Sequence, residues 1–465
     1  MSIINKTPNE IKEIIKKHLP VNNKQKEDHG EVFTPVFYLE AMLDTLPSYV
    51  WSNPDLKWLD PANGIGNFPM LIFEKLMRGL EKKIPNKARR AKHIIENMLF
   101  MVEIDEKNIE VSRQIFGSKA NIYKGSFLDK PNPFPNVKKF DIIVGNPPYN
   151  EGGTKSHGTK NIYVAFVQES LRLLSAGGYL LFIHPSNWRT PKKIKATGVD
   201  LNAVYTNLSL RNVIMYSQPK IIKDMGVMMS LDVVLVQNRP FSGEKTKITD
   251  INGKTSEVVI HPNSLIPNYG ADILEKMAKK VREVGKHIDL VRNSESHKQF
   301  MTPGKYKNIH GIVKKGVRVC SSKDKHSDTN TPKLLINGIG SHNYVFYDAY
   351  GHYGFTQNMV AVLKPSPKTK ILIRSKLFQY LANATKIIGN NFNIATENYL
   401  PLFNRSENIK TSQDLYDYFG FTAEEIKEIE KRRFPLYENK FLGCTKKKRD
   451  TKMKTKKTKK QRKNY

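Results

Sequence analysis

The 465-residue sequence has only two cysteines, no long apolar run and no apolar leader at its N-terminus. Cys320 and Cys444 stand far apart and lack the spacing of zinc ligands, which argues against a structural zinc site and indicates a reducing compartment. No stretch approaches the roughly 18 consecutive apolar residues that a membrane-spanning helix needs. The N-terminus, MSIINKTPNEIKEIIKK, has no apolar signal-peptide core. These absences predict a soluble, intracellular protein without a membrane partner.

Acidic side chains are scarce relative to basic ones. The chain has 44 Asp and Glu against 76 Lys and Arg, a net charge of +32. Part of this charge lies in residues 443–465, a Lys-rich tail that we expect to be disordered. The remainder is still strongly basic, which predicts a polyanionic partner, most simply nucleic acid. The tail also matches a nuclear-import-like cluster, so a nuclear location stays open for a eukaryotic host.

Two common nucleotide-binding signatures are also missing from the glycine-containing turn at residues 57–74. It has neither a G-x-G-x-x-G pattern nor a Walker lysine. A short strand ending at Trp58-Leu59 leads into a loop of small residues and then an apolar helix. The loop residues expected to hold a ligand are Asp60, Pro61, Ala62, Asn63, Gly64 and Gly66. A pyrophosphate site would need the Walker lysine or a longer glycine run. This loop therefore suits an amino acid joined to adenosine better than a pyrophosphate.

A polar tetrapeptide follows the most apolar strand expected in the chain. Residues 140–145 (FDIIVG) predict a buried parallel strand, and Asn146-Pro147-Pro148-Tyr149 stands at its C-terminal end, where open α/β sheets bind ligands. The prolines lack N–H donors, so the Asn146 amide oxygen and the Pro147 carbonyl form a pair of acceptors suited to an amino group. Tyr149 adds a flat face for a planar ring. A proline-rich turn without chemistry is the alternative.

Two further strands are expected to end in polar residues. The segment 98–105 (MLFMVEID) brings Glu103 to a strand tip, where an acid can accept both ribose hydroxyls of a nucleoside; Asp105 is the reserve. The segment 122–129 (IYKGSFLD) places Ser126 and Phe127 at the next tip, with Asp129 as an alternative acceptor. Upstream, Thr34 and Pro35 predict a helix N-cap and first helical position, whose free N–H groups could hold a carboxylate.

In this order, these motifs resemble the gamma-class DNA adenine-N6 methyltransferases that use S-adenosyl-L-methionine, usually partners of restriction systems. The resemblance covers roughly residues 29–240. It implies a catalytic set of Asn146, Pro147, Pro148 and Tyr149 that holds the flipped adenine. It implies cofactor contacts by Thr34 and Pro35, the loop from Asp60 to Gly66, Glu103, and Ser126 with Phe127. Asn63 in place of the family's usual Cys, and Ser126 in place of its usual Asp, depart from the pattern.

The alternation of strands and helices predicts a doubly wound, mostly parallel α/β sheet, the Rossmann-like fold of class I methyltransferases. The predicted domains are a helical lead-in at 1–28, a methyltransferase domain at 29–240, a mixed α+β target-recognition domain at 241–442 and the tail. Within the third, short strand-like runs stand at 257–260, 333–336 and 370–373. Residues 343–353 (NYVFYDAYGHY) interleave tyrosines with polar side chains, which suits either base stacking or a core.

The resulting hypothesis is methyl transfer from S-adenosyl-L-methionine to adenine N6 in double-stranded DNA, with the target base flipped out of the duplex. We expect a monomer that needs no metal, and the sequence leaves open whether a cognate restriction endonuclease exists. The alternatives are an RNA amino-methyltransferase, a protein glutamine-N5 methyltransferase and a non-catalytic nucleic-acid-binding protein. The lack of a Cys beside a Pro at the catalytic position argues against cytosine-C5 chemistry.

Overall fold

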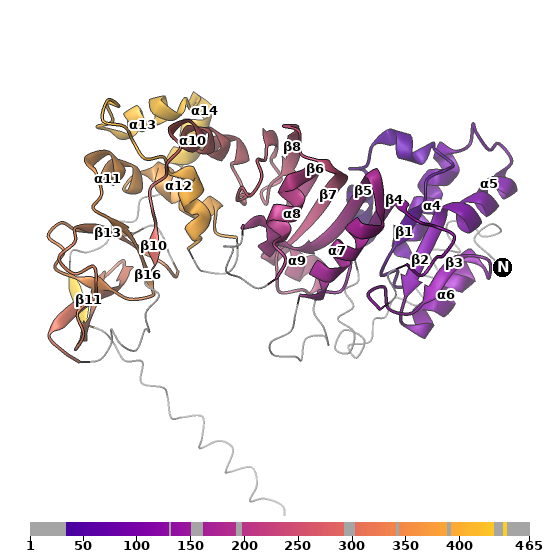
Figure 1. Ribbon diagram of the computed structural model, residues 1–465, viewed down its shortest axis with the longest axis horizontal. Helices are drawn as coiled ribbons and strands as arrows, with labels where there is room; N and C mark the ends of the chain where they lie inside the picture. The colour runs from indigo at the N-terminus through magenta and orange to yellow at the C-terminus, as the bar shows by residue number, and fades with distance from the viewer. Residues whose placement is uncertain are drawn as a thin grey trace, which may run out of the picture. The chain divides into compact units, whose positions relative to one another are not determined.

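The computed structural model describes residues 34–129, 132–149, 161–191, 198–292, 303–340, 344–387, 392–431 and 440–443 (Figure 1). The chain forms two compact units. Of the described residues, the first unit holds those up to Lys279 together with 384–387, and the second holds the rest. The predicted lead-in at 1–28 and the tail beyond Gly443 lie outside the described residues.

The first unit is built on a nine-stranded sheet in the order β3-β2-β1-β4-β5-β7-β6-β8-β9. The strands are β1 (Trp58–Asp60), β2 (Leu99–Glu103), β3 (Asn121–Lys124), β4 (Phe140–Gly145), β5 (Leu174–Pro185), β6 (Leu208–Tyr216), β7 (Leu231–Pro240), β8 (Lys245–Thr249) and β9 (Thr255–Val259). Strands β1 to β5 pair in parallel, and β7 runs antiparallel between β5 and β6. The predicted doubly wound, mostly parallel fold of a class I methyltransferase is therefore confirmed.

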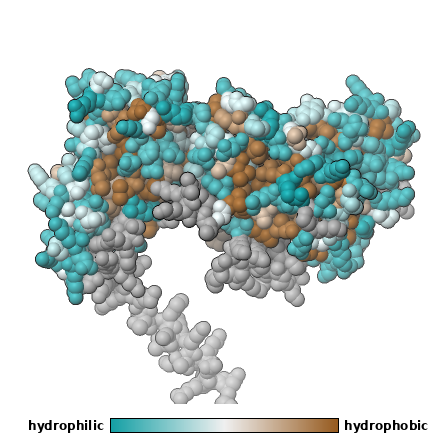
Figure 2. Space-filling model, viewed as in Figure 1, coloured by the Kyte–Doolittle hydropathy of each residue, from teal (hydrophilic) through white to brown (hydrophobic). Residues whose placement is uncertain are grey.

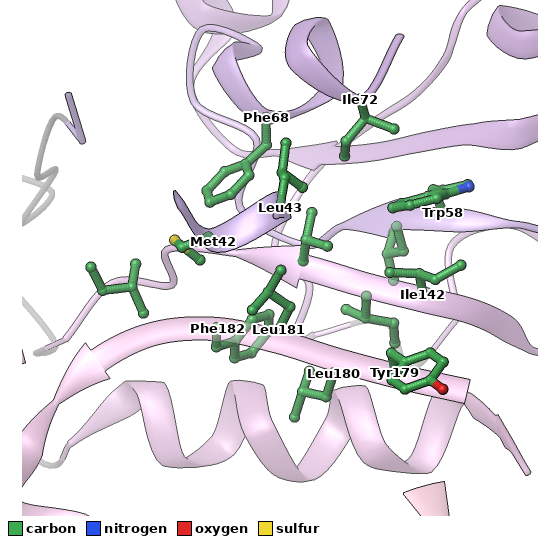
Figure 3. Packing of buried hydrophobic residues seen from close by; sticks show 14 of the residues in the cluster. Met42, Leu43, Trp58, Phe68, Ile72, Ile142, Tyr179, Leu180, Leu181 and Phe182 are labelled. Carbon is green, nitrogen blue, oxygen red and sulfur yellow. The ribbon is translucent and has the colours of Figure 1, made fainter. Parts of the chain in front are cut away.

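Helices of this unit follow the strands along the chain. They are α3 (Val36–Leu43), α4 (Asn67–Gly79), α5 (Lys87–His93), α6 (Glu106–Phe116), α7 (Ile162–Leu173), α8 (Leu201–Asn207), α9 (Gln218–Met225) and α10 (Ala271–Val284), with short turns η2 (Ser48–Trp51), η3 (Ile94–Met98) and η5 (Ser186–Arg189). Figure 3 shows Phe68 and Ile72 of α4 over the sheet, near Met42 and Leu43 of α3. Strand β4 is buried along nearly its whole length, which explains its unbroken apolar run.

The sheet continues beyond residue 240, where the sequence predicts a domain boundary. Strand β8 pairs in parallel with β6, and β9 pairs antiparallel with β8. The predicted run at 257–260 thus belongs to the edge of this sheet. The change of pattern at Pro240 marks the end of β7, because β8 and β9 follow without a helix between them.

The second unit contains two four-stranded sheets, ordered β10-β16-β13-β14 and β15-β11-β12-β17. The strands are β10 (Val291–Arg292), β11 (Tyr306–Val313), β12 (Gly316–Ser322), β13 (Lys333–Asn337), β14 (Val345–Asp348), β15 (Gly354–Phe355), β16 (Met359–Leu363) and β17 (Phe441–Gly443), and the helical segments are α11 (Pro367–Ile373), α12 (Lys376–Ala384), η7 (Ile394–Tyr399), α13 (Ser412–Phe419) and α14 (Ala423–Glu430). Ile309 and Ile312 of one sheet share a core with Leu335 and Met359 of the other.

One expectation about this unit is wrong. Residues 370–373 are not a strand, because they end α11, where Pro367 occupies a first-turn position and Ser366 Oγ accepts from the Thr369 N–H as an N-cap. Cys320 is buried in β12. In the part of the chain that the structure describes, no helix could cross a membrane and no three His, Cys, Asp or Glu side chains form a metal-binding group.

Candidate active site

The ends of three neighbouring strands bring the predicted site residues to one edge of the sheet. Strand β1 lies between β2 and β4 and is parallel to both. Asp60 is the last residue of β1, Glu103 is the last residue of β2, and Asn146 follows the last residue of β4. Parallel strands share the edge at which they end, so these three side chains come from adjacent points of the same edge.

The glycine loop between β1 and α4 adopts a backbone that only glycine accepts easily. Gly66 has φ 93°, and a Cβ at this position would lie 3.1 Å from Phe116 Cε2. Asn63, which replaces the family's usual Cys, fixes the loop: its backbone N–H donates to Val102 O at 2.9 Å, and its Nδ2 donates to Ser112 Oγ at 2.8 Å. Ser112 is fully buried on α6 and was not found from the sequence, because no local motif marks it.

Glu103 connects the end of β2 to the glycine loop. Its Oε2 accepts from the Gly64 N–H at 2.6 Å, and its Oε1 accepts from the Ile104 and Asp105 N–H groups at 2.9 and 2.8 Å. Asp105 instead caps α6, because its Oδ1 accepts from the Lys107 N–H at 2.8 Å. The geometry therefore favours Glu103 over Asp105 as the residue that faces a ligand in the loop.

Asp60 is a buried carboxyl with one oxygen unsatisfied. Its Oδ1 accepts from the Ala62 N–H at 3.1 Å, whereas Oδ2 has no hydrogen-bond partner among the residues that the structure describes. Burial raises the pKa of Asp60 to about 8; the Ala62 N–H opposes this rise and the nearby Glu103 adds to it. Gly145 leaves room for this carboxyl, since a Cβ there would lie 3.2 Å from Asp60 Oδ1.

This pKa makes stability fall as pH rises. Between pH 3.8 and about 8 the Asp60 carboxyl is ionised in the unfolded chain and protonated in the folded one, so the folded state binds more protons and loses stability with increasing pH. In urea denaturation without ligand, the free energy of unfolding of Asp60→Asn should not show this decrease. The stability of the variant relative to the wild type should therefore increase with pH between pH 3.8 and about 8. Parallel pH profiles for the two proteins would contradict the assignment.

The Asn146 carboxamide is held by Thr34. Its Nδ2 donates to Thr34 Oγ1 at 2.8 Å, which orients the carboxamide at the tip of β4. The predicted capping role of Thr34 is wrong: α3 begins at Val36, Pro35 takes the N-cap position, and no side-chain hydrogen bond caps the helix. Because the helix starts one residue later than predicted, the Thr34 hydroxyl does not cap it and instead accepts from Asn146 at the end of β4.

The remainder of the tetrapeptide is packed into the core. Pro147 is buried and Pro148 is half-buried. Tyr149 is 5% exposed, and its carbonyl accepts from the Ile162 N–H at the start of α7. Burial raises the pKa of the Tyr149 phenol, and a hydrogen bond with the Asn146 side chain opposes this shift. The ring of Tyr149 is thus covered in this structure.

Ser126 and Phe127 make local contacts after β3. Ser126 Oγ accepts from the Leu128 and Asp129 N–H groups at 3.2 and 3.3 Å, which closes a turn. Phe127 is 1% exposed, with its ring centroid 5.5 Å from that of Phe166. Asp129 is exposed. The predicted contact of Ser126 with an adenine amino group stays a prediction, since the hydroxyl already serves this turn.

A buried ion pair beside the site was missed from the sequence. At the end of β5, Arg189 Nε lies 2.9 Å from Asp232 Oδ2 on β7, and both side chains are fully buried. Asp232 also accepts from Ser186 Oγ and from Trp188 Nε1, each at 2.9 Å. These bonds fix the turn η5. In the sequence, the one indication of this ion pair is that polar residues directly follow an apolar strand. Asp232, the partner on β7, belongs to no recognisable motif.

The doubly wound, mostly parallel sheet is the fold of class I methyltransferases. Within that class, residues 62–221 match the family model described as Eco57I restriction-modification methylase. The matched region includes Gly64, Glu103 and the segment from Asn146 to Tyr149. The predicted resemblance to the gamma-class adenine methyltransferases of restriction systems is therefore confirmed.

The chain is also similar to individual proteins. An uncharacterized adenine-specific methylase of Mycoplasma pneumoniae is 29% identical over 37% of this chain and 58% of its own length. The type II methyltransferase M.PaeR7I of Pseudomonas aeruginosa is 25% identical over 35% of this chain and 33% of its own length. The matches thus span between a third and three-fifths of these relatives. A solved structure of the type IIL restriction-modification enzyme MmeI in complex with DNA aligns with a TM-score of 0.47 at 12% identity, over 82% of this chain and 68% of that one.

Proposed function

We propose that this protein transfers a methyl group from S-adenosyl-L-methionine to the N6 amino group of adenine in specific sites of double-stranded DNA. The observation that carries the proposal is the Asn146 carboxamide at the tip of β4, oriented by Thr34 and adjacent in the sheet to the end of β1 and its glycine loop. The match of residues 62–221 to a restriction-modification methylase family supports the choice of DNA and adenine.

The residues present fit the cofactor. The unsatisfied Oδ2 of Asp60 suits a cationic ammonium group, and Gly66, with φ 93°, lets the loop backbone lie close against Phe116. Glu103, whose carboxylate already orders that loop, would accept hydroxyl donors. When bound, S-adenosyl-L-methionine supplies an activated methyl group on its sulfonium, so the protein has to position an acceptor.

The catalytic residues act by holding the amine. The N6 lone pair of adenine is conjugated with the ring, so the Asn146 amide oxygen and the Pro147 carbonyl would accept from its N–H groups and localise the lone pair. Thr34 fixes the Asn146 side chain, which limits the positions the amine can take. Tyr149 would stack on the base only after its ring, now 5% exposed, is uncovered. Extruding the base from the duplex is necessary because stacking hides N6.

One labelling experiment tests this function. The full chain is incubated with methyl-labelled S-adenosyl-L-methionine and, in separate reactions, duplex DNA, RNA and a protein extract, and the products are digested to their components. Label in N6-methyladenine from DNA supports the proposal. Label found only in RNA or in glutamine would replace it with one of the alternative methyltransferases, and cofactor binding without transfer would favour a non-catalytic protein.

Glu103→Gln is expected to weaken binding of S-adenosyl-L-methionine about tenfold or more. A glutamine cannot accept from all three backbone N–H groups, because its Nε2 is itself a donor, so a buried donor loses its partner and the loop loosens. Calorimetric titration measures the affinity. Asp105→Ala is the matched control: it removes a helix cap at a cost of about 1 kcal/mol in stability but should leave the affinity unchanged. Equal affinities for Glu103→Gln and the wild type would refute the role of Glu103.

A further inference from the structure

The hairpin formed by β11 and β12, together with the residues that flank it, is strongly basic. Residues 303–325 contain seven Lys or Arg residues and a single acidic one, Asp324. All seven basic side chains are exposed: Lys305, Lys307, Lys314, Lys315, Arg318, Lys323 and Lys325. The region around β11 in Figure 1 is covered by hydrophilic residues in Figure 2. Such a concentration of one charge is more than solubility needs, and it is complementary to a phosphate backbone.

The hairpin is held rigidly. Ile309 and Ile312 of β11 and Val317 of β12 lie in the core between the two sheets. Asn337 of β13 connects the sheets, because its Oδ1 accepts from the Ile312 N–H at 2.8 Å and its Nδ2 donates to Ile312 O at 2.7 Å. Lys314 and Lys315 form the connection between the two strands. The closed end of the hairpin therefore carries two positive charges on a backbone that the core holds in place.

An aromatic turn stands beside the other end of the hairpin. Residues 349–353 join β14 to β15, and β15 pairs in parallel with β11, with Gly354 opposite Asn308. Tyr350 at the tip of this turn is 79% exposed, and its ring is stacked on that of His352 with centroids 5.5 Å apart. A largely exposed tyrosine on a turn that leads into a strand paired with basic β11 is a typical base-contacting arrangement.

The turn is built on a buried ion pair, so its shape is fixed. Lys333 is fully buried and its Nζ lies 3.0 Å from Asp348 Oδ2. The Asp348 carboxylate accepts from the His352 and Tyr353 N–H groups at 2.9 and 3.0 Å. Gly351 has φ 70°, and a Cβ there would lie 2.4 Å from the backbone at Asn330. The buried charges thus hold Tyr350 outward without contributing to the surface themselves.

We propose that the β11–β12 hairpin and the 349–353 turn form one DNA-binding surface, in which the lysines and Arg318 contact phosphates and Tyr350 contacts the bases. The proposal rests on the proposed function, since it takes duplex DNA as the partner. Phosphate contacts position a protein on DNA, whereas base contacts give it specificity. Removing the basic side chains of the hairpin should therefore weaken binding to any DNA sequence, whereas removing Tyr350 should lower the preference for one sequence.

The charge is tested with Lys314→Ala/Lys315→Ala/Arg318→Ala in the full chain, using a fluorescent duplex of arbitrary sequence. Affinity should fall about tenfold, and the slope of log affinity against log salt should shrink by about two to three, since each lost phosphate contact removes about 0.9. The matched control is Lys82→Ala/Lys83→Ala/Lys87→Ala, which removes the same charge from exposed positions in the stretch from the end of α4 to the first residue of α5. An unchanged slope for the hairpin variant, or equal losses in both variants, would overturn the phosphate contact.

The aromatic turn is tested on the sequence that the wild type methylates, identified by sequencing the modified DNA. Tyr350→Ala should lower the preference for that sequence over other DNA about fivefold or more while keeping the salt slope, and Tyr350→Phe should retain the preference. Undiminished preference in Tyr350→Ala would refute the base contact. If the wild type methylates DNA and the hairpin variant binds normally, only this inference fails. If the wild type binds DNA through the hairpin but transfers no methyl group, only the proposed function fails.

Discussion

Asn146→Ala is expected to lower the rate of methyl transfer to DNA by about a hundredfold to a thousandfold while S-adenosyl-L-methionine still binds. The loss of this size is typical of removing one preorganised hydrogen-bonding group at a reacting centre. Cofactor binding persists because Asp60 and Glu103 hold the glycine loop from the ends of β1 and β2, whereas Asn146 stands at the end of β4. Single-turnover methylation measures the first quantity and calorimetric titration measures the second.

Thr34→Val separates positioning from chemistry. Valine has nearly the shape of threonine but cannot accept from Asn146 Nδ2, so the carboxamide remains and its orientation is released. We expect a loss of about tenfold in the single-turnover rate, smaller than that of Asn146→Ala, since misplacement lowers the rate without removing the acceptor. If Asn146→Ala retained near-normal turnover, or lost cofactor binding in parallel with turnover, the catalytic assignment of Asn146 would be wrong.

The sheet and the strand-end positions were predictable because buried parallel strands have a local signature. Residues 140–145 form β4 as expected, since a strand covered on both faces is apolar throughout. Residues 333–336 likewise lie in β13. The run at 370–373 looks equally apolar, but the cap at Ser366 and the proline that follows decide for a helix. An apolar run therefore predicts a strand reliably only where the residues before it are not those that start a helix.

Contacts between distant segments could not be predicted from the same patterns. The bond from Asn146 to Thr34 joins residues 112 positions apart, and nothing in either motif specifies the other. The sequence predicted both residues to lie in a site, but it assigned Thr34 the role of a helix N-cap. The local sequence allows the helix to start at Pro35, as predicted, or at Val36, as observed. The pairing of β8 with β6 was missed for the same reason, since a strand's partner depends on the whole sheet.

Asp232→Ala is expected to lower the free energy of unfolding of the first unit by about 3–5 kcal/mol. The change leaves the guanidinium of Arg189 uncompensated in a site where both side chains are fully buried. Burial already lowers the pKa of Arg189, with Asp232 opposing that shift, so removal of the carboxylate leaves only the unfavourable contribution. Ser186 and Trp188 lose their acceptor as well, which loosens the turn η5 at the end of the strand next to β4.

Tryptophan fluorescence during urea denaturation isolates this effect, because Trp51, Trp58 and Trp188 all belong to the first unit. Glu106→Ala is the matched control: it breaks a shorter ion pair with Lys124, at 2.6 Å, but both partners are more than half exposed, so the expected loss is at most about 1 kcal/mol. The double change Arg189→Met/Asp232→Leu should recover much of the stability, since apolar residues replace both charges. Equal losses in Asp232→Ala and Glu106→Ala would show that the buried pair is not what holds the β5 end. Recovery of stability in the double variant without recovery of methyl transfer would show that the bonds of Asp232 serve the geometry of the site beyond keeping it folded.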